Sequence, residues 1–405
     1  MNYLFLHHNF PAQFVHLIRT LSARPGNKVV FLSETKHPAF QFENVTHGLV
    51  PVPQPRAEQD PAHRESDILL NRGEAFATAM LRLRQQGFIP DIVYDHCGWG
   101  CGLFAPDVFP EAFRAAYFEW YFTHHYPASL TAYTPEQRLA IFAPSRMRNQ
   151  CQLDALASCN LAISPTFWQQ SQYPEIVRNR IQVLHDGVDT QFFSPEPEPQ
   201  FYLQGDNPFS LPEGTEIVSY VCRAFEPCRG FPQVMRSLPL LLEKRPQCHV
   251  VIMGEDRVAY DPPRPDGRTW LEVMRAELPL DDPRIHFVGH GRSTAYVRLL
   301  RASSAHIYLT VSYVLSWSLV EAMSTGCLIV ASDTEPVREV IEHEKNGLLV
   351  PFNAPEVLAE RVAEALAHQD ALKPLREAAR QTVLERYNLR TLLYKHLALL
   401  HGKGG

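Results

Sequence analysis

Short apolar runs alternate with segments of helical period along almost the whole chain. In the first half, strands are expected at YLFLHH, KVVFLS, DIVYDH, RAAYFEW, NLAIS and RIQVLHD. In the second half, they are expected at EIVSYVC, HVVIMG, RIHFVG, AHIYLT, CLIVAS and GLLVPF. Short strands separated by helices indicate βαβ units and parallel sheets.

A segment without periodicity divides the chain. It reads SPEPEPQFYLQGDNPFSLPEG and is rich in proline, glycine and acidic residues, as linkers are. The pattern therefore predicts an α/β protein with two Rossmann-like, doubly wound domains facing a central cleft, with ligands beyond the carboxyl ends of the strands. The predicted boundaries are 1–194 for the N-terminal domain, 195–213 for the linker, 214–385 for the C-terminal domain and 386–405 for an amphipathic helix that is free to pack back on the first domain.

Composition narrows the class of protein. The 405 residues are 45% hydrophobic and 20% charged, as in soluble globular proteins. A net charge of -6 disfavours a nucleic-acid partner. No apolar run approaches the roughly eighteen residues of a membrane span, and the N-terminus reads as a strand, not a signal peptide. The eight cysteines lack zinc-site spacing, so we expect a reducing, cytoplasmic location.

The stretch VSYVLSWSLVEAMSTG (311–326) places a carboxylate, Glu321, inside an apolar helical segment. Two interpretations are open. In the first, Ser318 and Glu321 form a capping box, and Gly326 ends the helix in the left-handed conformation. In the second, the free N–H groups of 316–319 and the helix dipole form an anion site, and Glu321 accepts hydrogen bonds from ligand hydroxyls.

Two arginines favour the second interpretation. Arg223 and Arg229 flank the loop RAFEPCRGF, which follows the predicted strand EIVSYVC. They could be ordinary surface residues, but they lie at the same carboxyl edge as the 311–326 turn, and guanidinium groups bind phosphate bidentately. Two arginines, a helix N-terminus and Glu321 at one edge predict a nucleotide-diphosphate pocket.

Six segments occur in an order that resembles a known family. They are HDGVDTQFF (185–193), RAFEPCRGF (223–231), VIMGED (251–256), IHFVGH (285–290), SWSLVEAMSTGCLIVASD (316–333) and EVIEHEKNGLLVPF (339–352). Together they resemble the second half of a family-4 retaining glycosyltransferase with the GT-B fold, of the bacterial polysaccharide and cell-surface glycan type. The resemblance implies transfer of a sugar from a nucleotide-diphosphate sugar, such as a UDP- or GDP-sugar, to a saccharide or lipid-linked acceptor, with retention of configuration.

The resemblance also implies partners and roles. The nucleotide-sugar is a substrate, so no cofactor is expected, and peripheral contact with the inner face of the membrane is compatible with lipid-linked acceptors. No DxD motif or metal-site spacing occurs, so we expect no catalytic metal. Arg223 and Arg229 correspond to the family's diphosphate-binding and leaving-group residues, and Glu321 to its ribose ligand. The remaining donor-binding residues implied are Ser316, Trp317, Ser318 and Leu319 in the turn and Gly289 and His290 near the base.

Two positions depart from the family's pattern. Tyr313 stands where the family has a glutamate that touches the donor sugar, and we expect its hydroxyl, which carries no charge at neutral pH, to bind a hydroxyl of the donor sugar. Glu119, in the expected strand RAAYFEW, stands where the family often has a histidine, and we expect it to orient the acceptor or to steady the reacting centre. The alternative for Glu119 is a buried structural ion pair or hydrogen bond. In the loop HHNFPAQF, His8 and Asn9 are candidates for acceptor binding.

Two other functions stay open at this point. A nucleotide-sugar 2-epimerase would use the same fold without an acceptor. A non-catalytic sugar-nucleotide-binding subunit is suggested by Tyr313 in the glutamate's place.

Overall fold

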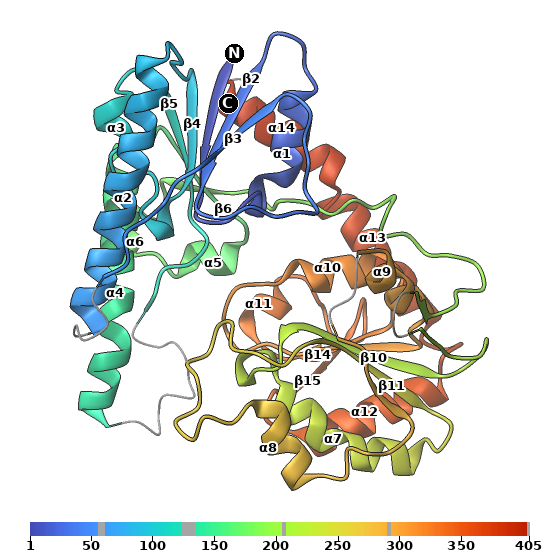
Figure 1. Ribbon diagram of the computed structural model, residues 1–405. Helices are drawn as coiled ribbons and strands as arrows, with labels where there is room; N and C mark the ends of the chain where they lie inside the picture. The colour runs from blue at the N-terminus through green and yellow to red at the C-terminus, as the bar shows by residue number, and fades with distance from the viewer. Residues whose placement is uncertain (56–60, 124–133, 205–207, 290–292, 403–405) are drawn as a thin grey trace. The chain divides into compact units, whose positions relative to one another are not determined.

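The computed structural model describes residues 1–55, 61–123, 134–204, 208–289 and 293–402. The chain forms two compact units. One comprises Met1–Asp186 and Arg390–Gly405, and the other comprises Gly187–Leu389. The chain thus enters the second unit before the expected linker at 195–213 and leaves it after residue 385. Each unit is a parallel sheet covered by helices on both faces, the expected doubly wound α/β architecture (Figure 1).

The first unit is built on a seven-stranded parallel sheet with the order β3-β2-β1-β4-β5-β6-β7. Its strands are β1 (Asn2–Leu6), β2 (Lys28–Ser33), β3 (Val45–Leu49), β4 (Ile92–His96), β5 (Phe113–Tyr117), β6 (Leu161–Ser164) and β7 (Ile181–Val183). The strand order reverses between β1 and β4, and ligands of such sheets bind beyond the carboxyl ends of the strands at this point.

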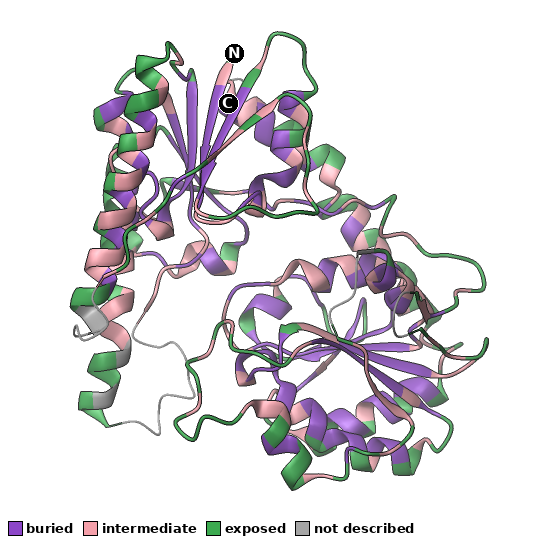
Figure 2. Ribbon diagram, in the orientation of Figure 1, coloured by how far each residue is buried: buried purple, intermediate pink, exposed green. Residues whose placement is uncertain are grey.

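Helices cover both faces of this sheet. They are α1 (Val15–Ser22), α2 (Pro61–Gln85), α3 (Ala105–Val108), α4 (Pro135–Ser158), α5 (Phe167–Ser171), α6 (Glu175–Arg178) and α14 (Leu389–Leu400). Helices α1 and α14 share one core with Phe5 and Tyr94, and α2 and α3 share another with Leu4 and Val93. Because alternate residues of a strand point to opposite faces, the two groups of helices lie on opposite sides of the sheet. Buried residues accordingly line the strands in Figure 2.

The second unit has a six-stranded parallel sheet with the order β12-β11-β10-β13-β14-β15. The strands are β10 (Ile217–Ala224), β11 (His249–Glu255), β12 (Ile285–Phe287), β13 (Ala305–Tyr308), β14 (Ile329–Ser332) and β15 (Leu348–Val350). Its helices are α7 (Phe231–Lys244), α8 (Trp270–Glu277), α9 (Ser293–Ala302), α10 (Trp317–Ser324), α11 (Glu335–Arg338), α12 (Pro355–Ala367) and α13 (Lys373–Arg386). The cores place α7 and α12 on one face of the sheet and α10 and α13 on the other.

Two expectations about local structure were wrong. The expected linker contains a short antiparallel pair, β8 (Tyr202–Leu203) and β9 (Phe209–Ser210), next to the buried Phe201. Strand β5 ends at Tyr117, so Glu119 lies beyond the strand and not within it.

The chain passes between the two units twice, at Gly187 and at Leu389, and these two segments lie side by side. Val188 N–H donates to Tyr387 O at 2.8 Å, and Leu389 N–H donates to Val188 O at 2.9 Å. Gly187 has φ 88°, and a Cβ added there would lie 2.6 Å from Leu389 Cα. Only glycine therefore fits at this crossing. Among the described residues, no helix combines the length and the apolar character that crossing a membrane requires.

Candidate functional site

A cavity of about 450 Å³ opens at the carboxyl edge of the sheet in the second unit. It lies where β10 and β13 end and where α10 begins. Its lining residues are Tyr220, Val221, Cys222, Arg223, Arg229, Met253, Tyr260, Tyr296, Tyr308, Leu309, Ser316, Trp317, Ser318 and Glu321. The structure thus brings six of the predicted site residues, Arg223, Arg229, Ser316, Trp317, Ser318 and Glu321, to one cavity.

Arg229 is the buried cation of this cavity. It ends the 3₁₀ turn η4 (Pro227–Arg229) and is 7% exposed. Its Nη1 donates to Thr310 Oγ1 at 2.9 Å and to Val314 O at 3.3 Å. Within the described part of the chain, no carboxylate forms an ion pair with it, although a buried charge without a counter-ion is costly. An anionic ligand in the cavity would supply the missing charge.

The backbone lets this arginine approach the end of β13. Gly230, the next residue, has φ 73°, and a Cβ there would lie 2.5 Å from Leu309 Cβ. A side chain at this position would both strain the backbone and collide with the side chain of Leu309, which follows β13, so glycine is required. Arg223 lies at the end of β10 and is exposed, which leaves its guanidinium accessible to a ligand.

The N-terminus of α10 faces the same space. Ser316 is the N-cap residue, and its Oγ accepts a hydrogen bond from Ser318 N–H at 3.3 Å. Ser316 N–H in turn donates to Tyr308 Oη at 3.0 Å. The first N–H groups of a helix and its dipole attract anions, so this turn supports the anion site that the sequence predicts. Leu319 is fully buried, so its side chain belongs to the core and not to the cavity lining.

Glu321 does not belong to a capping box. The helix begins at Trp317 with Ser316 as its cap, so Glu321 lies beyond the first turn, and the interpretation with Ser318 as cap is wrong. Tyr296 Oη donates to Glu321 Oε2 at 2.9 Å. Burial raises the pKa of Glu321 to about 7. Burial at a cavity wall with one tyrosine donor leaves acceptor capacity for ligand hydroxyls.

Two tyrosines lie against Arg229. The ring centroids of Tyr260 and Tyr313 are 5.3 Å and 5.9 Å from Arg229 Cζ. Tyr313 contacts Arg229 and is not among the residues that line the cavity, and its expected contact with the donor sugar stays a prediction. Sequence reasoning missed Tyr260 and Tyr296. The only available signal for Tyr260 was the non-periodic, proline-rich segment that follows VIMGED.

Of the two base-binding candidates, Gly289 is not among the residues that line this cavity. Gly289 follows β12, and its carbonyl accepts a hydrogen bond from Gly254 N–H at 2.9 Å, at the carboxyl edge of the sheet. His290 lies outside the described residues.

The first unit gathers polar residues at the carboxyl ends of its own strands. Glu119 Oε2 lies 3.2 Å from His96 Nε2, and Gln13 Nε2 donates to Glu119 Oε1 at 3.1 Å. These are contacts of the kind that the structural alternative predicts, but the Glu119 side chain is 31% exposed and not buried, so both interpretations of Glu119 stay open. His8 and Asn9 follow β1, with Asn9 Nδ2 2.8 Å from His8 Nε2.

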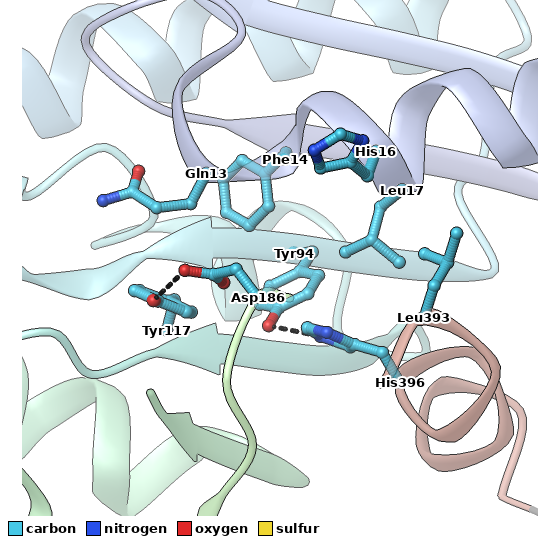
Figure 3. A pocket seen from close by; sticks show the side chains of 9 residues that line it. All are labelled: Gln13, Phe14, His16, Leu17, Tyr94, Tyr117, Asp186, Leu393 and His396. Carbon is cyan, nitrogen blue, oxygen red and sulfur yellow. Dashed lines mark hydrogen bonds between the residues drawn. The ribbon is translucent and has the colours of Figure 1, made fainter. Parts of the chain in front are cut away.

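A second cavity in the first unit is far smaller, about 10 Å³ (Figure 3). Tyr117 Oη donates to Asp186 Oδ2 at 2.9 Å, and Tyr94 Oη lies 2.8 Å from His396 Nε2. This space is at most large enough for one water molecule. The polar pairs around it are structural, and the pair Tyr94–His396 ties α14 to β4.

No group of three or more His, Cys, Asp or Glu side chains in the described ranges is arranged to hold a metal ion. The expectation of a site without a catalytic metal stays a prediction.

Comparison with known proteins identifies the family. Residues 25–193 match the family model "Glycosyl transferase family 4 group", and residues 206–382 match "Glycosyl transferases group 1". The phosphatidyl-myo-inositol mannosyltransferase of Mycobacterium tuberculosis is 25% identical over 183 residues, which are 44% of this chain and 44% of that protein. The chain therefore matches about half the length of this relative. An uncharacterized glycosyltransferase of Methanocaldococcus jannaschii is 32% identical over 107 residues, 26% of this chain and 27% of that protein.

Solved structures share the whole fold at low sequence identity. The sucrose-phosphate synthase of Thermosynechococcus elongatus aligns with a TM-score of 0.71 and 18% identity over 99% of this chain and 98% of that one. Anabaena Alr3699/HepE, solved in complex with UDP-glucose, aligns with a TM-score of 0.67 and 13% identity over 99% and 100% of the two chains. These likenesses support the two-Rossmann architecture. Since the two family models follow one another over most of the chain, this protein belongs to the glycosyltransferases of the family-4 type with the GT-B fold.

Proposed function

We propose that this protein transfers a sugar from a nucleotide-diphosphate sugar to a saccharide or lipid-linked acceptor, with retention of the anomeric configuration. The observation that carries the proposal is the cavity in which the buried Arg229 has no carboxylate partner among the described residues, while Glu321 and the N-terminus of α10 line the same space. Such a set suits a diphosphate joined to a ribose: cationic and N–H groups for the phosphates and an acceptor for the hydroxyls.

The chemistry follows from where charge develops. When the bond between the anomeric carbon and the phosphate oxygen breaks, negative charge grows on the diphosphate. Arg223, Arg229 and the α10 N–H groups stabilise that charge, as preorganised donors do in other transferases and hydrolases. The acceptor oxygen forms the new bond to the anomeric carbon, and its proton passes to the leaving phosphate oxygen.

In this proposal the first unit serves the acceptor. Glu119, held between His96 and Gln13, accepts a hydrogen bond from an acceptor hydroxyl, and His8 and Asn9 bind further hydroxyls. Holding the acceptor in one orientation lowers the entropic cost of the transfer step. One relative is named a phosphatidyl-myo-inositol mannosyltransferase, which supports including lipid-linked hydroxyl compounds among the acceptors, with peripheral contact to the cytoplasmic face of a membrane.

The test is an incubation with UDP- and GDP-sugars and a panel of saccharide and lipid-linked acceptors. The released nucleoside diphosphate is quantified, and the anomeric configuration of the product is read by NMR. The parent protein should release nucleoside diphosphate only with an acceptor and should do so in EDTA, because arginines supply the positive charge. Arg229→Met should greatly lower the rate of release, whereas Arg236→Met, which removes an exposed surface ion pair with Glu277, should leave the rate unchanged. Binding without turnover on any acceptor would contradict the proposal.

A further inference from the structure

The loop after β11 carries an aromatic ring onto the arginines of the cavity. Tyr260 is 43% exposed, yet its ring centroid lies 5.3 Å from Arg229 Cζ and 6.0 Å from Arg223 Cζ. The ring centroids of Tyr260 and Tyr313 lie 6.4 Å apart, and the two ring planes make an angle of 70°. An exposed ring at the rim of a cavity contributes little to the core, so packing alone does not explain its position.

One buried carboxylate holds this loop in place. Glu226 is 2% exposed, and its Oε1 accepts hydrogen bonds from the N–H groups of Ala259 at 2.7 Å, Tyr260 at 2.9 Å and Asp261 at 3.1 Å. Its Oε2 accepts a further bond from Tyr260 N–H at 3.1 Å. Three consecutive backbone groups thus converge on one side chain, which fixes the course of the loop.

The loop holds the arginine turn in return. Asp261 Oδ2 accepts a hydrogen bond from Cys228 N–H at 2.9 Å, immediately before Arg229. Glu226 itself immediately precedes the turn Pro227–Arg229. Each segment therefore positions the other, and we call the two carboxylates, Glu226 and Asp261, the clasp.

The two carboxylates of the clasp do not pair with the positive charge of Arg229. In the part of the chain that the structure describes, neither Glu226 nor Asp261 forms an ion pair with Arg229. Glu226 is satisfied by backbone N–H groups, and Arg229 Nη1 by Thr310 and Val314. An aromatic ring interacts with the face of a guanidinium group, whereas phosphate oxygens bind its N–H edge. A ring and a phosphate can therefore bind the same arginine together.

We propose that Tyr260 is a ligand-binding residue that covers the diphosphate subsite, and that Glu226 is its positioning residue, acting through the loop. This inference rests on the proposed function, since it assigns the anion held by Arg229 to a nucleoside diphosphate. The aromatic ring reduces the access of water to the guanidinium groups, which strengthens their attraction for phosphate in the cavity. The loop is thereby part of the donor site and not only a surface connection.

The test uses the full-length protein and isothermal titration calorimetry with UDP and with GDP. Tyr260→Ala should weaken binding of the nucleotide that the parent prefers by about tenfold, and Tyr260→Phe, which keeps the ring, by no more than about twofold. Glu226→Gln removes the charge that the three N–H groups share and should weaken binding about as much as Tyr260→Ala. The double variant should be no more than about twofold weaker than either single variant, because both act through one ring. Tyr394→Ala, at an exposed tyrosine in the first unit, serves as the matched control.

The outcomes separate this inference from the proposed function. If the parent binds neither UDP nor GDP, the proposed function is contradicted, whatever the Tyr260 variants show. If the parent binds and Tyr260→Ala binds equally well, the inference is overturned while the proposed function stands. Additive losses in the double variant would overturn the role of Glu226 as a positioning residue. If Glu226→Gln does not fold, the pair Tyr260→Ala and Tyr260→Phe still decides, because an exposed tyrosine can be replaced without disturbing the core.

Discussion

Replacing Glu321 by glutamine should raise stability and lower nucleotide affinity at the same time. Glutamine keeps the shape of the side chain and an oxygen that accepts the hydrogen bond from Tyr296. It removes a carboxylate that burial makes costly to ionise, as the pKa of about 7 shows. It also removes the negative acceptor that would bind ribose hydroxyls. The two effects have opposite signs, and a capping residue would show neither of them.

The size of the stability effect follows from proton linkage. The pKa of Glu321 rises from 4.5 in the unfolded chain to about 7 in the folded protein. A raised pKa means that the contribution to stability is fully present below pH 4.5 and is lost as the pH rises through 7. At about 1.4 kcal/mol per pKa unit the loss is about 3 kcal/mol, which water in the cavity reduces to about 2 kcal/mol. The Glu321→Gln side chain does not ionise, so the variant does not undergo this loss. Its free energy of unfolding should exceed that of the parent by near zero at pH 4.5 and by about 2 kcal/mol at pH 8.5.

The assay is a melting series at pH 4.5, 6.5 and 8.5, with and without UDP or GDP. A two-unit protein need not melt in one step, so the transition that the nucleotide raises is the one to follow. Glu321→Gln should melt roughly 4 to 8 °C above the parent at pH 8.5 and within about 1 °C of it at pH 4.5. Its affinity for the nucleotide should be about tenfold lower at pH 8.5, since a neutral acceptor makes a weaker hydrogen bond.

The control is Glu377→Gln at an exposed position in the interior of α13, which should change neither quantity. The reasoning is refuted if Glu321→Gln melts below the parent at pH 8.5 or binds nucleotide as tightly as the parent does.

Three further predictions concern the rest of the molecule. Arg229→Met removes a buried cation, so the melting temperature should stay the same or rise. Its turnover should fall far more than its Michaelis constant rises, and the reverse kinetic pattern would count against a role of Arg229 in the transition state. Burial lowers the pKa of His306 and of His396 from 6.5 to about 4, so the stability that these two residues contribute is complete above pH 6.5 and is lost as the pH falls from 6.5 to 4. In denaturation titrations over this range, His306→Asn should therefore lose less stability than the parent does. Gly187→Ala should lower the free energy of unfolding by more than about 1 kcal/mol, because its Cβ meets Leu389 at a positive φ; an unchanged denaturation midpoint would contradict this reading of the crossing.

The parallel sheets were predictable because their strands are buried on both faces. Runs such as HVVIMG and CLIVAS are apolar without alternation, as strands between two helical layers must be. Strand β3 was not predicted, because its sequence VTHGL at the sheet edge is only partly buried and has no apolar run. The pair β8 and β9 was missed for a similar reason, since two-residue strands carry no periodicity.

The charged part of the candidate site was predictable from local spacing. Arg223 lies at the end of a recognisable strand and Arg229 on the short loop after it. Glu321 lies in a helix whose N-terminus meets that loop at the sheet edge. The start of that helix was misplaced because Ser316 and Ser318 are both good caps, and only the backbone conformation decides between them.

The aromatic part of the site was not predictable. Tyr260 reaches Arg229 through a non-periodic loop whose course depends on the single carboxylate of Glu226. Tyr296 reaches Glu321 from α9, and no motif in the sequence pairs these two residues. Contacts of this kind depend on tertiary packing and leave no signal in the spacing of residues along the chain.

The most direct test of the account is a calorimetric titration of the full-length protein with UDP and GDP, each compared with its nucleoside, uridine or guanosine. If the cavity of the second unit holds a nucleotide diphosphate, at least one diphosphate should bind with micromolar affinity and its nucleoside should bind far more weakly. Arg229→Met should reduce this difference without abolishing it, because it removes the buried cation while Arg223 and the N–H groups of α10 still bind the diphosphate. Equal binding of diphosphate and nucleoside, or undiminished binding by Arg229→Met, would contradict the account.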